Sequence, residues 1–266
     1  MTDRCYLSDE VLHKNRIEKE PIFFGALTRR YLEKLREWWR GYTLPDFKET
    51  NKAYLFYEMR NHPNIEFVLY NCLYFCEGFG LVVYCSRENV NRIREVLGHN
   101  VDRAEIHVLF ETDVGREVGR RVYNEFLMSL DTWENFPAEH VLVCELDAYF
   151  LRKLPAEFLN YDYVSYKWPW LPEEPGGGGI SLRRRSAMVR ICKESKQPPV
   201  YGQDSWASTG VRELGLSFIQ GFNESTVNDN TIAVHQWWTF IDYEKHGNEA
   251  WFKRLCGYLL TLDIPI

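Results

Sequence analysis

The sequence contains no hydrophobic run long enough to cross a membrane. Its longest uncharged aliphatic and aromatic run spans residues 67–76, whereas a membrane-spanning helix needs roughly 20 such residues. The N-terminus carries Asp3, Arg4 and Asp9, where a signal peptide would be apolar. We therefore expect a soluble, cytoplasmic protein with no targeting segment and no transmembrane segment.

Excess positive charge is also lacking. The formal net charge is −6, and non-specific binding to nucleic acids needs clustered basic residues, so we expect no nucleic-acid partner. The seven cysteines are an odd number with no tight framework, which favours reduced thiols. Cys72 and Cys76 are four positions apart, which is not the spacing of a zinc knuckle. We expect them to be buried packing residues.

The chain is long and apolar enough for a sizeable α/β domain, with 266 residues of which 45% are hydrophobic. From about residue 51, short apolar runs alternate with segments of helical spacing. This pattern is typical of βαβ units and of a mostly parallel sheet covered on both faces. The predicted strands are 53–57, 81–84, 105–110 and 141–146, and the predicted helices are 64–75, 90–97, 114–130, 186–193 and 205–214.

The first 48 residues follow a different pattern, in which apolar side chains recur at helical spacing among charged ones. This predicts an amphipathic helix that ends near Gly41. We interpret residues 1–48 as an N-terminal helical extension that packs on the main domain, residues 49–266; partner binding by the helix is the alternative. The recurring apolar positions are Leu27, Tyr31, Leu35 and Trp38.

The fourth predicted strand ends in two carboxylates, Glu145 and Asp147. Residues two apart on an extended chain point the same way, and open α/β sheets bind ligands at the carboxyl ends of their strands. Carboxylate oxygens suit Mn²⁺ or Mg²⁺, which commonly bridge to substrate phosphates. The alternative is structural: Asp147 caps the next turn and Glu145 pairs with an arginine.

Further candidates lie in the second half of the chain. Four glycines, residues 176–179, predict a tight loop that lets a ligand approach the backbone, or else a flexible connector. Asp204 opens a predicted helix, either as an N-cap or as the acceptor of a proton from an attacking hydroxyl. His235 follows a short apolar strand and is either structural or a ligand.

Tryptophans also gather in this half. Their rings stack well on sugars, so they are candidates for binding a glycan acceptor, with core packing as the alternative. They are Trp168, Trp170, Trp206, Trp237 and Trp238.

An ordered set of motifs runs through residues 51–238. In order, they are Glu58-x-Arg60, residues 62–71, residues 80–86 with Asn89, Glu145-Leu-Asp147, residues 161–165 with Trp168, residues 178–183, Gln203-Asp204 and Val234-His235. This set resembles a family of small GT-A glycosyltransferase-like proteins found in large DNA viruses of algae, in fungi and in bacteria. The resemblance implies a GT-A-like fold, a mixed and mostly parallel sheet flanked by helices.

The resemblance also implies roles for individual residues. Two features depart from the family pattern: the metal motif begins with Glu145, and Gln203 stands where an acidic residue is more usual beside Asp204. The implied roles are nucleotide base and ribose contacts for Glu58 and Arg60, metal binding for Glu145, Asp147 and His235, the sugar pocket for Gly178, Gly179 and Ser181, and the catalytic base for Asp204.

Together these observations predict a metal-dependent, inverting glycosyltransferase that uses Mn²⁺ or Mg²⁺. The donor is a nucleotide-sugar, with a UDP-sugar favoured because such donors are common, and the acceptor is a hydroxyl of a glycan or glycoconjugate. A non-catalytic glycan- or nucleotide-sugar-binding protein on the same scaffold is the alternative. A sugar-phosphate nucleotidyltransferase is disfavoured, because Glu58-Met-Arg60 is not the glycine-rich signature expected after its first strand.

Overall fold

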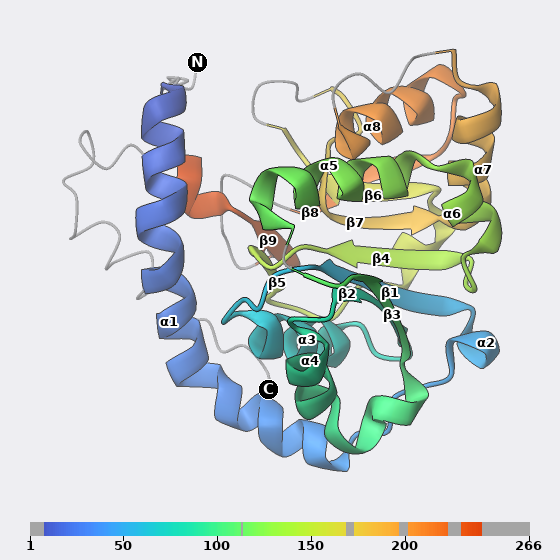
Figure 1. Cartoon of the computed structure of the whole chain (residues 1–266). Helices are drawn as coiled ribbons and strands as arrows, with labels where there is room; N and C mark the ends of the chain where they lie inside the picture. Colours follow the sequence, from blue (N-terminus) through green and yellow to red (C-terminus); the bar gives the residue numbers. More distant parts are fainter. Residues whose placement is uncertain (1–7, 113, 169–172, 197–201, 223–229, 241–266) are drawn as a thin grey trace.

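A seven-stranded sheet forms the centre of the molecule (Figure 1). The computed structural model describes residues 8–112, 114–168, 173–196, 202–222 and 230–240. The strands lie in the order β3-β2-β1-β4-β7-β6-β8. Their bounds are β1 (Lys52–Glu58), β2 (Gly80–Ser86), β3 (Glu105–Phe110), β4 (His140–Cys144), β6 (Tyr163–Tyr166), β7 (Gly177–Arg184) and β8 (Phe218–Phe222).

The sheet is mixed and mostly parallel, as the sequence predicted. Strands β3, β2, β1 and β4 run parallel to one another, and β8 runs parallel to β6. Only β7 is antiparallel to its neighbours, β4 and β6. A separate two-stranded sheet pairs β5 (Ala148–Phe150) with β9 (Ala233–His235). The parallel strands place their carboxyl ends along one edge, where open α/β sheets bind ligands.

Helices cover both faces of the sheet (Figure 1). Along β1, Tyr54 and Phe56 join the hydrophobic cluster on one face, and Ala53 and Leu55 join the cluster on the other. This alternation is what a strand buried on both sides requires. The helices are α1 (Asp9–Gly41), α2 (Phe47–Thr50), α3 (Ile65–Phe75), α4 (Val90–Leu97), α5 (Gly115–Met128), α6 (Leu130–Asn135), α7 (Arg185–Glu194) and α8 (Gln203–Glu213), with single 3₁₀ turns η1 (Gly98–Arg103), η2 (Ala156–Asn160) and η3 (Trp237–Phe240).

Three sequence predictions need correction. The helix predicted over 114–130 ends at Met128, because Ser129 takes an extended conformation and α6 begins after it. The fourth strand ends at Cys144 instead of residue 146, because the chain turns at once. The glycine segment, predicted as a loop, lies mostly within β7, where Gly177 to Ile180 pair with the flanking strands β6 and β4.

The N-terminal helix α1 begins at Asp9, well before the predicted amphipathic stretch, and ends at Gly41 as predicted. Leu27, Tyr31 and Leu35 are buried in the same hydrophobic cluster as α3, which confirms the packing interpretation for this face. Nearer its start, Phe23 and Phe24 pack against aromatic rings of β5 and η3. In Figure 1 the helix runs along one side of the molecule.

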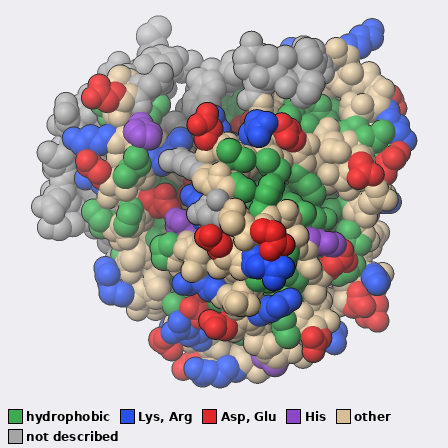
Figure 2. Space-filling model, viewed as in Figure 1, with side chains coloured by type: hydrophobic (Ala, Val, Ile, Leu, Met, Phe, Trp, Pro, Cys, Tyr) green, Lys and Arg blue, Asp and Glu red, His purple; other side chains and the backbone are tan. Residues whose placement is uncertain are grey.

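The surface carries both charge signs. On the face drawn in Figure 2, acidic and basic side chains lie interspersed, and hydrophobic side chains gather near α5. Exposed apolar residues of β3 and α5 include Val108, Leu109 and Val118, each about two-fifths exposed. Cys72 and Cys76 are buried, as predicted for packing residues. Within the described residues, none of the helices combines the length and the apolar character needed to span a bilayer.

The docking of α1 predicts unequal effects of two substitutions on this helix. Phe24→Ala removes a ring that packs against Phe67, Tyr149 and Trp238, so the free energy of unfolding should fall by about 3–5 kcal/mol. Ile22→Ala is the control, because Ile22 is 54% exposed and surface changes usually stay within about 0.5 kcal/mol. Urea unfolding measures both. Equal effects would show that α1 does not dock in this way.

Candidate metal centre

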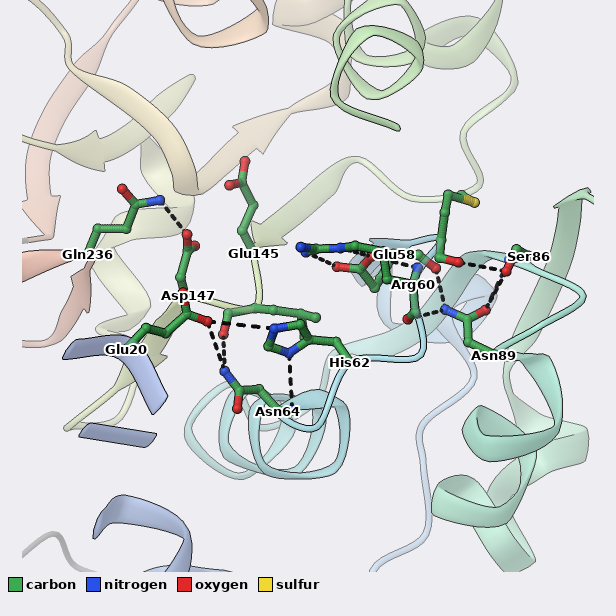
Figure 3. A network of polar contacts seen from close by, with 12 residues as sticks. Glu20, Glu58, Arg60, His62, Asn64, Ser86, Asn89, Glu145, Asp147 and Gln236 are labelled. Carbon is green, nitrogen blue, oxygen red and sulfur yellow. Dashed lines mark hydrogen bonds and ion pairs between the residues drawn. The ribbon is translucent and has the colours of Figure 1, made fainter. Parts of the chain in front are cut away.

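The two acidic residues lie on a turn that joins β4 to β5. The Glu145 N–H donates to the Gly179 carbonyl of β7 at 2.8 Å, and the Ala148 N–H donates back to the Glu145 carbonyl at 3.0 Å. Asp147 therefore comes just before β5, and the two carboxylates are not neighbours on one extended strand as predicted. The turn still places both on the same side, as Figure 3 shows.

Strand β9 brings His235 to this turn. His235 pairs with Ala148 across the two-stranded sheet, and the Gln236 N–H donates to the Asp147 carbonyl at 3.1 Å. His235 Nε2 lies 3.3 Å from Asp147 Oδ1 and 4.0 Å from Glu145 Oε2. One potential ligand atom from each residue falls within 4.8 Å of the others, and the searched part of the chain, its described residues, shows no second such group.

The immediate surroundings fix the imidazole and one carboxylate. The His235 ring is buried and stacks on Tyr166 with ring centres 4.8 Å apart. Gln236 donates its side-chain amide to Asp147 Oδ2 (Figure 3). A Cβ on Gly179 would lie 2.3 Å from His235 Nε2, so only glycine fits beside this ring. Support of this kind from outside the ligand set is what orients metal ligands in proteins.

The electrostatics indicate a site that gains from a cation. Loss of solvent and the charge of Asp147 raise the pKa of Glu145, while His235 opposes this. For Asp147, burial would raise the pKa, but His235, Gln236 and the charge of Arg16 together lower it. Asp147 Oδ1 is buried and accepts no hydrogen bond from a described residue. Two carboxylates and an imidazole fit Mn²⁺ or Mg²⁺, and a divalent cation would favour the ionised form of both acids.

A second polar cluster stands at the carboxyl end of β1 (Figure 3). The Glu58 carboxylate accepts hydrogen bonds from Arg60 Nε at 2.8 Å and from Arg60 Nη2 at 2.7 Å. The Asn89 amide donates to the Glu58 and Arg60 carbonyls at 2.7 and 2.9 Å. Glu58 raises the pKa of Arg60 most, and Asp147 adds to this. Arg60 is therefore held in place and faces the acidic turn.

Asp204 lies in the first turn of α8, near the same acids. Its Oδ1 accepts a hydrogen bond from the Ser205 N–H at 2.8 Å, and the N-cap position belongs to Gly202, so the N-cap alternative for Asp204 is wrong. Its negative charge adds to the raised pKa of Glu145. Burial raises the pKa of Tyr123 most, and the charges of Glu145 and Asp204 add to this. The fold thus brings Asp204 toward the predicted metal ligands.

The predicted sugar-pocket residues Gly178 and Ser181 lie next to a buried arginine, Arg183. Arg183 of β7 is fully buried; its Nε donates to Ser181 Oγ at 2.9 Å, and its guanidinium donates to the Gln203 side chain. A Cβ on Gly178 would lie 2.7 Å from this guanidinium and 2.4 Å from Gln203 Nε2. Gly178 and Ser181 therefore lie around Arg183. Gln203, which departs from the family pattern, is the first residue of α8, and its contact with Arg183 holds this end of the helix beside Asp204.

The tryptophans mostly pack in the core. Trp168, Trp206 and Trp238 are buried, which supports the packing alternative for these three. Trp170 and the Trp237 side chain lie outside the described residues.

Sequence reasoning missed Gln236, Arg183, Tyr123 and Arg16. Gln236 stands next to His235, and that adjacency is the only sequence signal for its role. Arg183 ends the quoted motif of residues 178–183, but an arginine on a strand does not reveal that it is buried. Tyr123 lies on a predicted helix without a motif, and Arg16 lies before the predicted amphipathic stretch.

A family model for proteins of unknown function, DUF5672, matches residues 109–249, more than half of the sequence. This chain belongs to the DUF5672 family. The matched region of this DUF5672 protein includes the acidic turn, β7, the start of α8 and His235. The comparison with curated proteins found no match.

Solved structures similar to this DUF5672 protein include two glycosyltransferases. One is the mannosyltransferase PcManGT from Pyrobaculum calidifontis in complex with GDP-Man and Mn²⁺, with a TM-score of 0.44, 18% identity, and coverage of 92% of this chain and 72% of that chain. The other is mouse xyloside xylosyltransferase 1 in its apo form, with a TM-score of 0.43, 10% identity, and coverage of 73% of this chain and 91% of that chain. At these scores the function has to be argued from the site itself.

The centre predicts graded losses of Mn²⁺ binding. Asp147→Asn removes a charged ligand and should abolish measurable binding in calorimetry or in a titration followed by electron paramagnetic resonance. Gln236→Leu leaves the ligands but frees Asp147, so Mn²⁺ affinity should fall by about 10–100-fold. Asp102→Asn is the control, because Asp102 is exposed on η1 away from the centre. Unchanged affinity in Asp147→Asn would remove Asp147 from the ligand set.

Proposed function

We propose that this protein is a metal-dependent glycosyltransferase of the GT-A kind, which moves a sugar from a nucleotide-diphosphate-sugar to an acceptor hydroxyl. One observation carries the proposal: Glu145, Asp147 and His235 meet at the carboxyl end of β4, and the charge of Asp204 acts on Glu145. A cation site at this edge of a mostly parallel sheet, beside a carboxylate able to act as a base, suits transfer from a diphosphate leaving group.

Each residue has a task in this proposal. Asp147, Glu145 and His235 hold the cation, and Gln236 orients Asp147 through its amide. When bound, the cation would neutralise negative charge on the diphosphate as it leaves. Gly178 and Gly179 pack so closely against Gln203 and His235 that added Cβ atoms would collide, and the proposal places the sugar pocket beside this closely packed backbone.

Asp204 is the proposed base. It lies in the first turn of α8, where the helix N-terminus favours negative charge, and its carboxylate can accept a proton. The acceptor oxygen attacks the anomeric carbon and its proton passes to Asp204, while the bond from that carbon to the diphosphate oxygen breaks. A single displacement of this kind inverts the anomeric configuration.

The proposal leaves open the nucleotide base of the donor and the identity of the acceptor. A screen of UDP- and GDP-sugars, with Mn²⁺ present and absent, tests the proposal directly by following sugar release. Donor hydrolysis that needs Mn²⁺ would support a transferase. Mn²⁺-dependent nucleotide binding without any turnover, across donors and glycan acceptors, would favour the non-catalytic binding protein instead.

Asp204→Asn tests the base. Removal of a general base typically costs about 10²–10⁴-fold in rate, so kcat should fall by that amount while the affinity for donor and Mn²⁺ stays close to wild type. Glu213→Gln is the matched control at the other end of α8, where Glu213 bonds to Ser195 and Lys196 on the surface. An Asp204→Asn enzyme with normal kcat would exclude Asp204 as the base.

A further inference from the structure

The first half of α1 is tied to both segments that build the metal centre. The Asn15 amide donates to the Thr239 carbonyl of η3, just after His235 and Gln236, at 3.0 Å. Glu20 accepts a hydrogen bond from the Asn64 amide at 3.4 Å (Figure 3). The same amide donates at 3.3 Å to the carbonyl of Leu146, between the two acids. These hydrogen bonds therefore hold the first half of α1 next to the candidate metal centre.

Arg16 lies on this face of the helix. It follows Asn15 directly and precedes Glu20 by four residues, a spacing that places both side chains on one side of a helix. Its Nε is buried and has no hydrogen-bond partner among the described residues. Arg16 is close enough for its positive charge to act on the Asp147 carboxylate. A buried N–H without a partner is costly, so an acceptor that reached Arg16 Nε would bind favourably.

Arg60 approaches the acidic turn from another direction. Figure 3 shows Arg60 on one side of Glu145 and Asp147, and Glu20 of α1 on the other. The only described acid in ion-pair contact with Arg60 is Glu58, which holds the Nε edge and one terminal nitrogen. Its side chain remains 41% exposed, so the guanidinium keeps a face for a ligand.

The chemistry of these groups indicates an anion with several oxygens. Once a divalent cation neutralises Glu145 and Asp147, the guanidinium groups of Arg16 and Arg60 remain near it, with Arg60 still paired to Glu58. Guanidinium groups bind phosphate oxygens with two parallel hydrogen bonds, and a diphosphate is long enough to contact a cation and flanking arginines together.

We propose that Arg16 of α1 and Arg60 after β1 form a diphosphate subsite at the metal centre, so that α1 contributes to substrate binding as well as packing. This inference rests on the proposed function, because it places the diphosphate of the donor between the two arginines. It also assigns Arg60 to phosphate, whereas the sequence resemblance implied contacts to the base and ribose.

Calorimetry with UDP and with GDP in the presence of Mn²⁺ tests the subsite on the full-length protein. Arg16→Gln should weaken binding of the nucleoside diphosphate by about 10–100-fold, the loss expected for a charge-assisted hydrogen bond. Arg16→Lys, which keeps the charge, should recover part of it. Arg29→Gln is the control, because Arg29 is an exposed arginine of the same helix, and it should bind like wild type.

Binding of Mn²⁺ without nucleotide distinguishes loss of the phosphate contact from misfolding. Arg16→Gln should bind Mn²⁺ as well as wild type or more tightly. Loss of Mn²⁺ binding in both Arg16 variants would show that Arg16 is structural and would overturn the subsite. Equal UDP or GDP affinity in wild type and Arg16→Gln would overturn it too, while leaving the transferase proposal intact. If the wild-type protein binds no nucleoside diphosphate with Mn²⁺, the proposed function itself fails.

Discussion

The site depends on how one short acidic turn is held. Glu145 and Asp147 are like charges in a partly enclosed place, so the turn is under electrostatic strain in the absence of a cation. Backbone contacts hold it from three directions: Gly179 of β7 accepts from Glu145, Gln236 donates to Asp147, and Asn64 donates to the Leu146 carbonyl. These three contacts use no carboxylate oxygen; the Gln236 side chain bonds to Asp147 Oδ2, and Asp147 Oδ1 stays available to a ligand. The scaffold thus keeps the two acids together without neutralising them.

The parallel half of the fold was readable from the sequence, because strands buried on both faces are continuously apolar and helices repeat every three to four residues. The helix 90–97 and the strand 105–110 were predicted with their observed bounds. The glycine segment was misread because glycine favours turns as a local rule. Here its lack of a side chain is used inside a strand, where Gly178 and Gly179 lie against Gln203 and His235. This packing depends on tertiary contacts that the local sequence does not predict.

The candidate site shows the same division. The motif Glu145-x-Asp147 and the isolated His235 were visible in the sequence, but their meeting depends on the pairing of β5 with β9, which no local pattern predicts. Glu145 and Asp147 do lie on the same side, but a turn brings them together where an extended strand was predicted. Supporting groups such as Arg183 and Gln236 act through partners distant in sequence, so single-sequence reasoning had no means to find them.

The contacts of α1 have a consequence for how the molecule folds. Asn15 and Thr239 are 224 residues apart, and Phe23 packs on Tyr149 and Trp238, so docking of this helix closes a very long loop. Contacts of such separation form late, because their entropy cost comes before their reward. A partly folded chain with the sheet complete and α1 undocked would leave this aromatic surface open to water. The species most prone to aggregation would thus be the one whose candidate metal centre is still unfinished.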